Sequence, residues 1–192
     1  MPKRLRTKAR VLASLVLLMS LALFILSAPQ EAKEAGQKAG SPPTGSIIKF
    51  SCPRAWAATS GQPTPEGLEW IAKQGYRAVI NFRTDQEGVD IAAEANHARQ
   101  LGMNYIHIPA PFPELPDEAV DKFLAAVADP KNRPVYIHCT TANRVGAFWM
   151  IYLVTKEGLS VEKAQEEAAG VGLKNQKLID AARNYLSRHA RP

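Results

Sequence analysis

The pattern of hydrophobic and polar positions changes twice along the chain. An apolar run covers residues 11–28 and is interrupted only by small hydroxyl side chains. Residues 31–46 are small and polar without apolar periodicity, which predicts a flexible linker. From residue 47 to about 190, short apolar stretches alternate with segments whose apolar residues recur every three or four positions. The pattern therefore predicts one folded domain, residues 47–190, behind a linker and an N-terminal apolar segment.

Within this domain, strand-like and helix-like segments follow one another. Strands are predicted over residues 77–82, 104–108 and 135–138. Helices are predicted over residues 64–75, 87–101, around 120–127, over 144–156, after 160 and over 173–189. This alternation predicts an α/β fold with a central, mostly parallel sheet flanked by helices. In such sheets ligands bind at the carboxyl ends of strands, so functional residues are expected in the turns that follow them.

The N-terminus has the order of an export signal. Five basic and no acidic residues lie in the first 30 positions, namely Lys3, Arg4, Arg6, Lys8 and Arg10. The apolar run after them is longer than the usual signal core of about 7–15 residues and short for a membrane span. Residues 1–30 are therefore predicted to be either a cleaved signal or an anchor that holds residues 11–28 in the membrane. In both cases we expect the domain outside the cytoplasmic membrane, in the periplasm or cell envelope.

The charge of the rest of the chain excludes a basic nucleic-acid-binding surface. The formal net charge is +6, but residues 31–192 carry 19 Lys and Arg against 18 Asp and Glu. Nucleic acid is therefore not expected as a partner. The sequence has no Walker-type, dinucleotide-binding or zinc-binding pattern, so no metal or cofactor is expected.

The turn after the strand at 135–138 carries the candidate chemistry. It runs from Cys139 to Arg144, where the next helix begins. Free amide N–H groups at a helix N-terminus bind anions and favour a thiolate over a thiol. An arginine that closes the same loop can bind two oxygens of an oxyanion. The pattern indicates nucleophilic phosphoryl transfer; the alternative is a buried, inert cysteine with an arginine on the surface.

Two segments of the sequence resemble a known family. VYIHCTTANRVGAFWMIYL, residues 135–153, resembles the signature of cysteine-dependent protein phosphatases, and is most similar to the bacterial beta-lactamase hydrolase-like, dual-specificity-like group. The segment SGQPTPEGLEWIAKQGYRAVINFRTDQE, residues 60–87, resembles a second part of the same family. The resemblance implies a cysteine-dependent phosphatase fold and a phosphorylated protein or small molecule as the substrate.

The same resemblance assigns roles to individual residues. Cys139 is implied as the nucleophile and Arg144 as the phosphate clamp. The backbone amides of the loop between them are implied to bind the phosphate, and they belong to Thr140, Thr141, Ala142 and Asn143. Arg83 is expected to reach the same crevice, and His138 is expected to orient the loop.

Three departures from the family pattern keep other functions open. Four residues separate Cys139 from Arg144, whereas protein tyrosine phosphatases generally have five, and four is also the loop length of rhodanese-type sulfurtransferases. Ala142 stands at the usual glycine position. Val145 follows the arginine, where the family often has a Ser or Thr that hydrogen-bonds the thiolate. Thr140 or Thr141 could form this hydrogen bond instead. The alternatives are a rhodanese-like sulfurtransferase with a persulfide on Cys139 and a catalytically silent anion-binding module; the 60–87 segment favours the phosphatase.

The general acid is expected on the proline-rich loop at residues 109–121, where phosphatases of this kind carry an acidic residue. Glu114 is the predicted acid because it lies within the loop. Asp117 and Glu118 are expected instead to serve the first turn of the next helix, where negative charge is favourable. Asp85 and Glu87 are the other candidates.

The chain has two cysteines, Cys52 and Cys139. A low-pKa thiolate in an oxidising compartment is prone to oxidation. We therefore expect that Cys52 can form a reversible disulfide with Cys139, provided that their Cα atoms lie within roughly 7 Å.

Overall fold

The structure is a computed structural model that describes residues 40–189; the predicted export segment, residues 1–30, lies outside the described residues. Its centre is a five-stranded sheet in the order β1-β2-β5-β3-β4. β1 runs antiparallel to β2, and the other neighbours are parallel. The strand bounds are β1 Ser51–Arg54, β2 Ala57–Ser60, β3 Ala78–Asn81, β4 Asn104–His107 and β5 Val135–His138. The prediction of an α/β fold with a mostly parallel sheet is confirmed.

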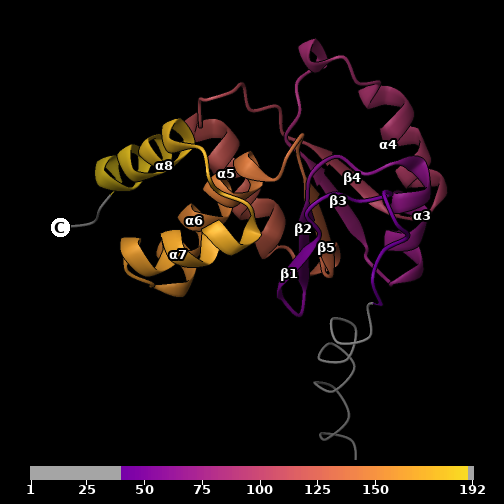
Figure 1. Cartoon of the computed structure of the whole chain (residues 1–192), viewed down its shortest axis with the longest axis horizontal. Helices are drawn as coiled ribbons and strands as arrows, with labels where there is room; N and C mark the ends of the chain where they lie inside the picture. Colours follow the sequence, from indigo (N-terminus) through magenta and orange to yellow (C-terminus); the bar gives the residue numbers. More distant parts are fainter. Residues whose placement is uncertain (1–39, 190–192) are drawn as a thin grey trace, which may run out of the picture. The chain divides into compact units, whose positions relative to one another are not determined.

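Helices cover both faces of the sheet (Figure 1). On one face lie α3 (Pro65–Lys73) and α4 (Ile91–Gln100), and on the other lie α5 (Asp117–Ala128), α6 (Asn143–Glu157), α7 (Val161–Val171) and α8 (Gln176–Arg188). Two short 3₁₀ turns are η1 (Asp85–Glu87) and η2 (Pro130–Asn132). The first ten residues of α6 after Asn143 are all buried, because the other three helices of that face pack around it.

The strands place alternate side chains in two separate apolar clusters. In β5, Val135 and Ile137 belong to the cluster under α5–α8, whereas Tyr136 belongs to the cluster under α3 and α4. β3 alternates in the same way. This is the two-residue period of a sheet that is buried on both faces.

The strand register brings four strand ends to one edge. His138 of β5 is paired with Ser60 of β2 and with Asn81 of β3, and Asn81 is paired with His107 of β4. The segments that follow these residues therefore start side by side. As predicted, the candidate turn after β5 lies at this carboxyl edge of the sheet.

Two sequence predictions require correction. The strands β1 and β2 were not predicted, because AATS in β2 lacks the large β-branched residues that indicate a strand, although all four residues are buried. The helix predicted over residues 87–101 begins only at Ile91. Gly88 adopts a left-handed conformation with φ 69°, which separates η1 from α4, and Asp90 caps α4 by accepting a hydrogen bond from the Ala93 amide. Glu87 therefore belongs to η1 and not to α4.

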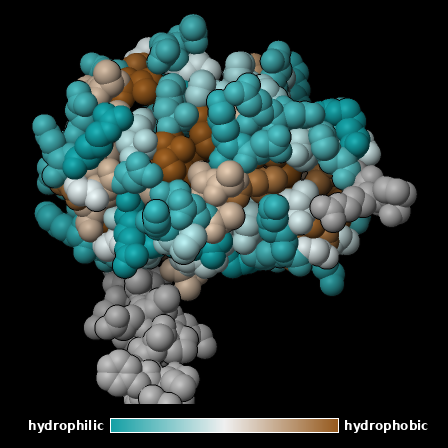
Figure 2. Space-filling view, turned by 180° about the vertical axis from the view of Figure 1, so that it is seen from behind, coloured by the Kyte–Doolittle hydropathy of each residue, from teal (hydrophilic) through white to brown (hydrophobic). Residues whose placement is uncertain are grey.

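The surface shown in Figure 2 is mainly hydrophilic, and its hydrophobic residues lie largely in recesses between hydrophilic ones. Among residues 40–189, none of the helices has the length and apolar character needed to span a bilayer.

Candidate active site

The segment between β5 and α6, residues 139–144, forms one wall of a cavity. Cys139 is 1% exposed and directly follows the last residue of β5. The cavity has a volume of about 290 Å³. It is lined from this segment, here called the 139–144 loop, by Cys139, Thr140, Thr141, Asn143 and Arg144, and from elsewhere by Glu87, Phe112, Asn175 and Leu178. The structure thus brings the predicted nucleophile, clamp and loop residues together, with the exception of Ala142, which is fully buried.

Neighbouring segments hold the 139–144 loop in place. The Gln62 amide donates a hydrogen bond to the Thr140 carbonyl at 3.1 Å, and Lys49 Nζ donates to the Thr141 carbonyl at 3.1 Å. The Asn143 side-chain oxygen accepts hydrogen bonds from the amides of Lys174 at 2.8 Å and Asn175 at 3.0 Å. The loop is therefore anchored both to the segment after β2 and to the segment before α8.

Ala142 caps α6 in a conformation that L-amino acids rarely adopt. Its φ is 68°, and its side chain forms no capping hydrogen bond. A left-handed backbone costs a residue with a Cβ about 1–2 kcal/mol. Because α6 begins directly after Ala142, the positive end of a 15-residue helix lies beside Cys139. Such a helix end favours a bound anion.

The Arg144 side chain is buried and fully oriented by the protein. Its Nη1 donates to the carbonyls of Phe82 at 2.9 Å and Ala110 at 2.8 Å. Both terminal nitrogens bind the Glu87 carboxylate, at 2.7 and 2.6 Å. Nη2 also donates to Thr140 Oγ1 at 3.0 Å. Such a two-point ion pair fixes the plane of the guanidinium as well as its position.

Glu87 is an anchor for Arg144 and not an acid. Burial raises the pKa of Glu87, but hydrogen bonds from Arg144, Thr140 and the Thr84 amide outweigh it and lower the pKa to about 2. The carboxylate is therefore ionised at neutral pH and has no proton to donate. The sequence alone does not reveal this role, because residues 87–101 have the pattern of a helix.

Arg83 lies beside the cavity and is not among the residues that line it. Its side chain is buried and donates to Gln62 Oε1 at 2.8 Å and to the Glu87 carbonyl at 2.8 Å. The expectation that Arg83 reaches the same crevice is therefore corrected, since its guanidinium contacts Glu87, which lines the cavity, and does not line the cavity itself.

The proline-rich loop contributes an aromatic ring to the cavity. Phe112 is 54% exposed and lines the cavity with Cys139. Glu114 lies two residues further on, is exposed, and its amide donates to the Pro111 carbonyl. Its assignment as the general acid stays a prediction. Asp85 lines a different cavity, with His107, and Asp117 starts α5 and forms an ion pair with Arg188.

The predicted disulfide between the two cysteines is wrong. Cys52 lies on β1, with its sulfur 3.9 Å from the Tyr76 hydroxyl, and Tyr76 belongs to the cluster under α3 and α4. Cys139 belongs to the cluster on the opposite face. β2 lies between β1 and β5. With a spacing of about 4.8 Å between neighbouring strands, the two cysteines are separated by about 10 Å across the strands, before any displacement along them is added. Both thiols are free.

His138 is completely buried next to the nucleophile. Its ring stacks on Tyr136 with centroids 5.6 Å apart, and its Nε2 lies 3.1 Å from Glu94 Oε1. At this distance the ring lies against the carboxylate, although it is not aligned for a regular hydrogen bond. His138 therefore connects the start of the 139–144 loop to α4.

Comparison with known proteins gives a consistent result. Residues 53–183 match the family model described as "DSP-PTPase phosphatase fused to NAD+ Kinase". The chain is 28% identical over 138 residues to a beta-lactamase hydrolase-like protein of Xylella fastidiosa, covering 69% of this chain and 30% of that protein. It is 27% identical over 122 residues to "Probable NAD kinase 2, chloroplastic" of Oryza sativa, covering 60% of this chain and 12% of that protein. The matched part of the chain thus spans less than a third of the length of either relative.

Solved structures share the fold. A DUF442 protein of Shewanella putrefaciens CN-32 superposes with a TM-score of 0.64 at 24% identity, covering 76% of this chain and 95% of that one. P. aeruginosa TpbA in complex with pTyr superposes with a TM-score of 0.58 at 20% identity, covering 72% of this chain and 83% of that one. At these identities the likeness concerns the fold alone.

Proposed function

The chain belongs to the family of DSP-PTPase phosphatase domains described as fused to NAD+ kinase, and we propose that it hydrolyses phosphomonoesters through a cysteinyl-phosphate intermediate, without a metal ion. One observation carries the proposal. The Cys139 thiol, the Arg144 guanidinium and the N-terminus of α6 converge on a single cavity of about 290 Å³. A nucleophile and a fixed array of donors for an oxyanion are the two requirements of this reaction.

In the first step, the Cys139 thiolate attacks the phosphorus atom and forms the S–P bond. The bond between phosphorus and the ester oxygen breaks, and the leaving oxygen takes a proton from the general acid, which we assign to Glu114. Arg144 and the amides of the 139–144 loop stabilise the charge on the remaining phosphate oxygens.

In the second step, a water molecule attacks the phosphorus of the cysteinyl-phosphate. The S–P bond breaks, and the sulfur leaves as a thiolate. The carboxylate that donated its proton in the first step takes one from the water, so inorganic phosphate is released and the enzyme returns to its starting state.

The cavity suits an organic phosphate with an apolar part. Phe112 and Leu178 line it together with the polar loop residues. The complex of P. aeruginosa TpbA with pTyr supports a phosphorylated side chain as substrate for this fold. We therefore propose aryl phosphates, including phosphotyrosine, as the substrates to test first.

The decisive experiment compares two reactions of the purified full chain. Hydrolysis of p-nitrophenyl phosphate in the presence of EDTA is expected, and sulfur transfer from thiosulfate to cyanide is not. Cys139→Ser should abolish hydrolysis and still bind vanadate. Arg144→Lys should lose about 10²–10³-fold in kcat, because one ammonium cannot replace the two-point contact with Glu87 that orients the guanidinium in the cavity. Cys52→Ser is the control and should hydrolyse at the wild-type rate. Sulfur transfer without hydrolysis, or hydrolysis that EDTA abolishes, would reject the proposal.

We also propose that the phosphatase domain acts outside the cytoplasmic membrane. The support is the sequence order of residues 1–30, basic first and apolar second. Fractionation of cells that express the full chain, followed by mass spectrometry of its N-terminus, tests this. Intact Met1 together with recovery in the cytoplasmic fraction would contradict it.

A further inference from the structure

A buried carboxylate that the reaction does not use, Glu94, lies at the carboxyl edge of the sheet. Its side chain extends from α4 and is 10% exposed. Asn81 Nδ2, at the end of β3, donates to its Oε1 at 2.9 Å, and the Tyr105 hydroxyl of β4 donates to the same oxygen. His138, at the end of β5, faces Oε1 as well, and Gln62, two residues after β2, donates to Oε2. One side chain thus contacts residues of β3, β4 and β5 and the turn that follows β2.

This carboxylate is held in its ionised form. Burial raises the pKa of Glu94, but the contacts with His138, Tyr105 and Gln62 outweigh it and lower the pKa to about 2. A buried anion with this many donors is a rigid centre, because any rearrangement would leave a donor or the charge without a partner.

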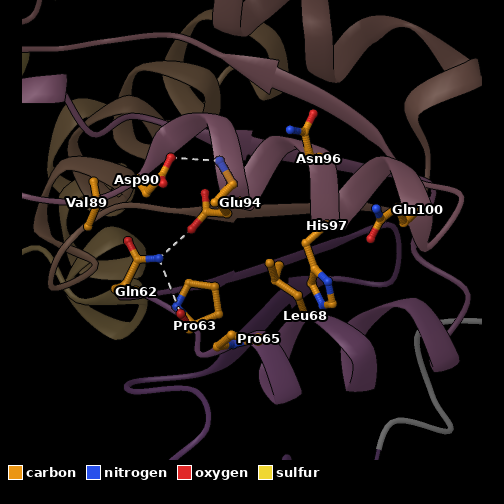
Figure 3. A pocket seen from close by; sticks show the side chains of 11 residues that line it. Gln62, Pro63, Pro65, Leu68, Val89, Asp90, Glu94, Asn96, His97 and Gln100 are labelled. Atoms are coloured by element: carbon orange, nitrogen blue, oxygen red, sulfur yellow. Dashed lines mark hydrogen bonds between the residues drawn. The ribbon is translucent and has the colours of Figure 1, made fainter.

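The contact with Gln62 connects Glu94 to the backbone of the 139–144 loop. Figure 3 shows the two side chains pointing toward each other, in the wall of a second cavity with a volume of about 490 Å³. The Gln62 backbone amide donates to the Thr140 carbonyl at 3.1 Å. A side chain that fixes Gln62 therefore also fixes the residue next to the nucleophile.

Gln62 also connects Glu94 to Arg144 through side-chain contacts. The side-chain NH₂ of Gln62 donates to Glu94, and its side-chain oxygen accepts a hydrogen bond from Arg83 Nη1 at 2.8 Å. Arg83 in turn binds Glu87, with its Nε 3.3 Å from Oε2, and Glu87 holds Arg144. The amide of Gln62 fits this chain of contacts in only one orientation, since its donor must face an anion and its acceptor a cation.

We propose that Glu94 is a positioning residue of the active site: by orienting Gln62, it positions both the Thr140 carbonyl, next to Cys139, and the Arg83–Glu87–Arg144 chain. The proposal rests on the proposed phosphatase function. Glu94 does not line the cavity that contains Cys139, so it acts through its neighbours.

Exchanging the side chains of residues 62 and 94 tests this proposal. Whichever way its amide turns, Glu94→Gln sets an NH₂ group against another donor, either the NH₂ group of Gln62 or the donors of Asn81 and Tyr105. Turning the Gln62 amide would in turn place its NH₂ against Arg83. We expect kcat/KM for p-nitrophenyl phosphate to fall about tenfold to hundredfold, the size of a lost hydrogen bond to a charged group. The double variant Gln62→Glu with Glu94→Gln restores a donor–acceptor pair and an anion facing Arg83, and should recover most of that loss. Glu166→Gln, on the exposed face of α7, is the charge-matched control and should equal the wild type.

A second readout is independent of hydrolysis. The rate at which iodoacetate alkylates Cys139, divided by the rate for Cys52, reports the anion-binding geometry of the loop, with Cys52 as an internal standard. This ratio should fall in Glu94→Gln and recover in the double variant. If the wild type does not hydrolyse the phosphate, the proposed function fails, whereas the ratio still tests the positioning.

Two results would overturn the proposal. One is wild-type kinetics and an unchanged alkylation ratio in Glu94→Gln. The other is a folded double variant, with a wild-type circular dichroism spectrum, that recovers neither quantity. If Glu94→Gln does not fold, Gln62→Glu alone takes its place in the comparison, since it sets two carboxylates against each other and the double variant should again relieve the defect.

Discussion

The methyl group of Ala142 occupies the space that a side chain on Gly172 would need. A Cβ built on Gly172 would lie 2.8 Å from the Ala142 Cβ, closer than such atoms approach in proteins. Ala142 has a φ of 68° and Gly172, which ends α7, a φ of 128°. The 139–144 loop therefore accommodates an alanine at its left-handed position because a glycine from a distant segment leaves room for it.

Gly172→Ala should destabilise the protein more than a surface substitution does. We expect the free energy of unfolding to fall by about 2–4 kcal/mol, from backbone strain at a positive φ and from overpacking against Ala142. Urea unfolding measures this. The double variant Gly172→Ala with Ala142→Gly should regain the part of this free energy that is lost to overpacking. The effects of the two substitutions on the free energy of unfolding should therefore not be additive. Additive effects would show that the two residues do not compete for this space.

The parts of the fold that could be predicted from the sequence are those whose signal is local. The strands β3, β4 and β5 are rich in β-branched and aromatic residues, and α3 has its cap, Thr64, and a proline at its first turn. β2 could not be predicted, because its small residues are buried only through the strands on both sides of it. β2 forms because it pairs with strands on both sides of it, and its own sequence carries no pattern that predicts a strand.

The same distinction applies to the candidate site. Cys139 and Arg144 could be identified because they lie in one turn between a strand and a helix. Glu87 lies 57 residues before Arg144, and Glu94 faces His138 across the sheet edge. Nothing in their own neighbourhood marks either carboxylate as a partner of the loop, since only the parallel register brings these segments together.

Glu114→Gln should slow poor substrates more than good ones. A general acid matters when the leaving group needs a proton, so kcat for phenyl phosphate should fall about 10²-fold or more, while kcat for p-nitrophenyl phosphate should change by less than about tenfold. Steady-state kinetics on both esters measure the difference. Glu118→Gln, an exposed glutamate of α5 that pairs with Lys122, is the matched control. An equal loss on both esters would remove Glu114 from this role.

The stability of the domain should depend on pH through Glu94. Its pKa is about 2 in the folded state, below the value of about 4.3 for an unfolded glutamate, so the folded state favours the ionised form. The stability that it contributes is complete above pH 4.3 and is lost as the pH falls toward 2. The free energy of unfolding should therefore decrease over this range, by up to about 1.4 kcal/mol per pH unit for this one group. Urea titrations at several pH values should give a smaller slope for Glu94→Gln, and an equal slope would contradict the assignment.

Peroxide should oxidise Cys139 without joining it to Cys52. The two thiols lie on opposite faces of the sheet, with β2 between their strands, whereas a disulfide needs Cα atoms within roughly 7 Å. The Cys139 sulfur should form a sulfenic acid first and, without a resolving thiol, proceed to the sulfinic acid. Peptide mass spectrometry after peroxide treatment measures both products. Cys52→Ser should leave the rate of inactivation unchanged, because Cys52 offers no protection. An intramolecular Cys52–Cys139 crosslink, or faster inactivation of Cys52→Ser, would mean that the sheet edge opens far enough in solution for the two residues to meet.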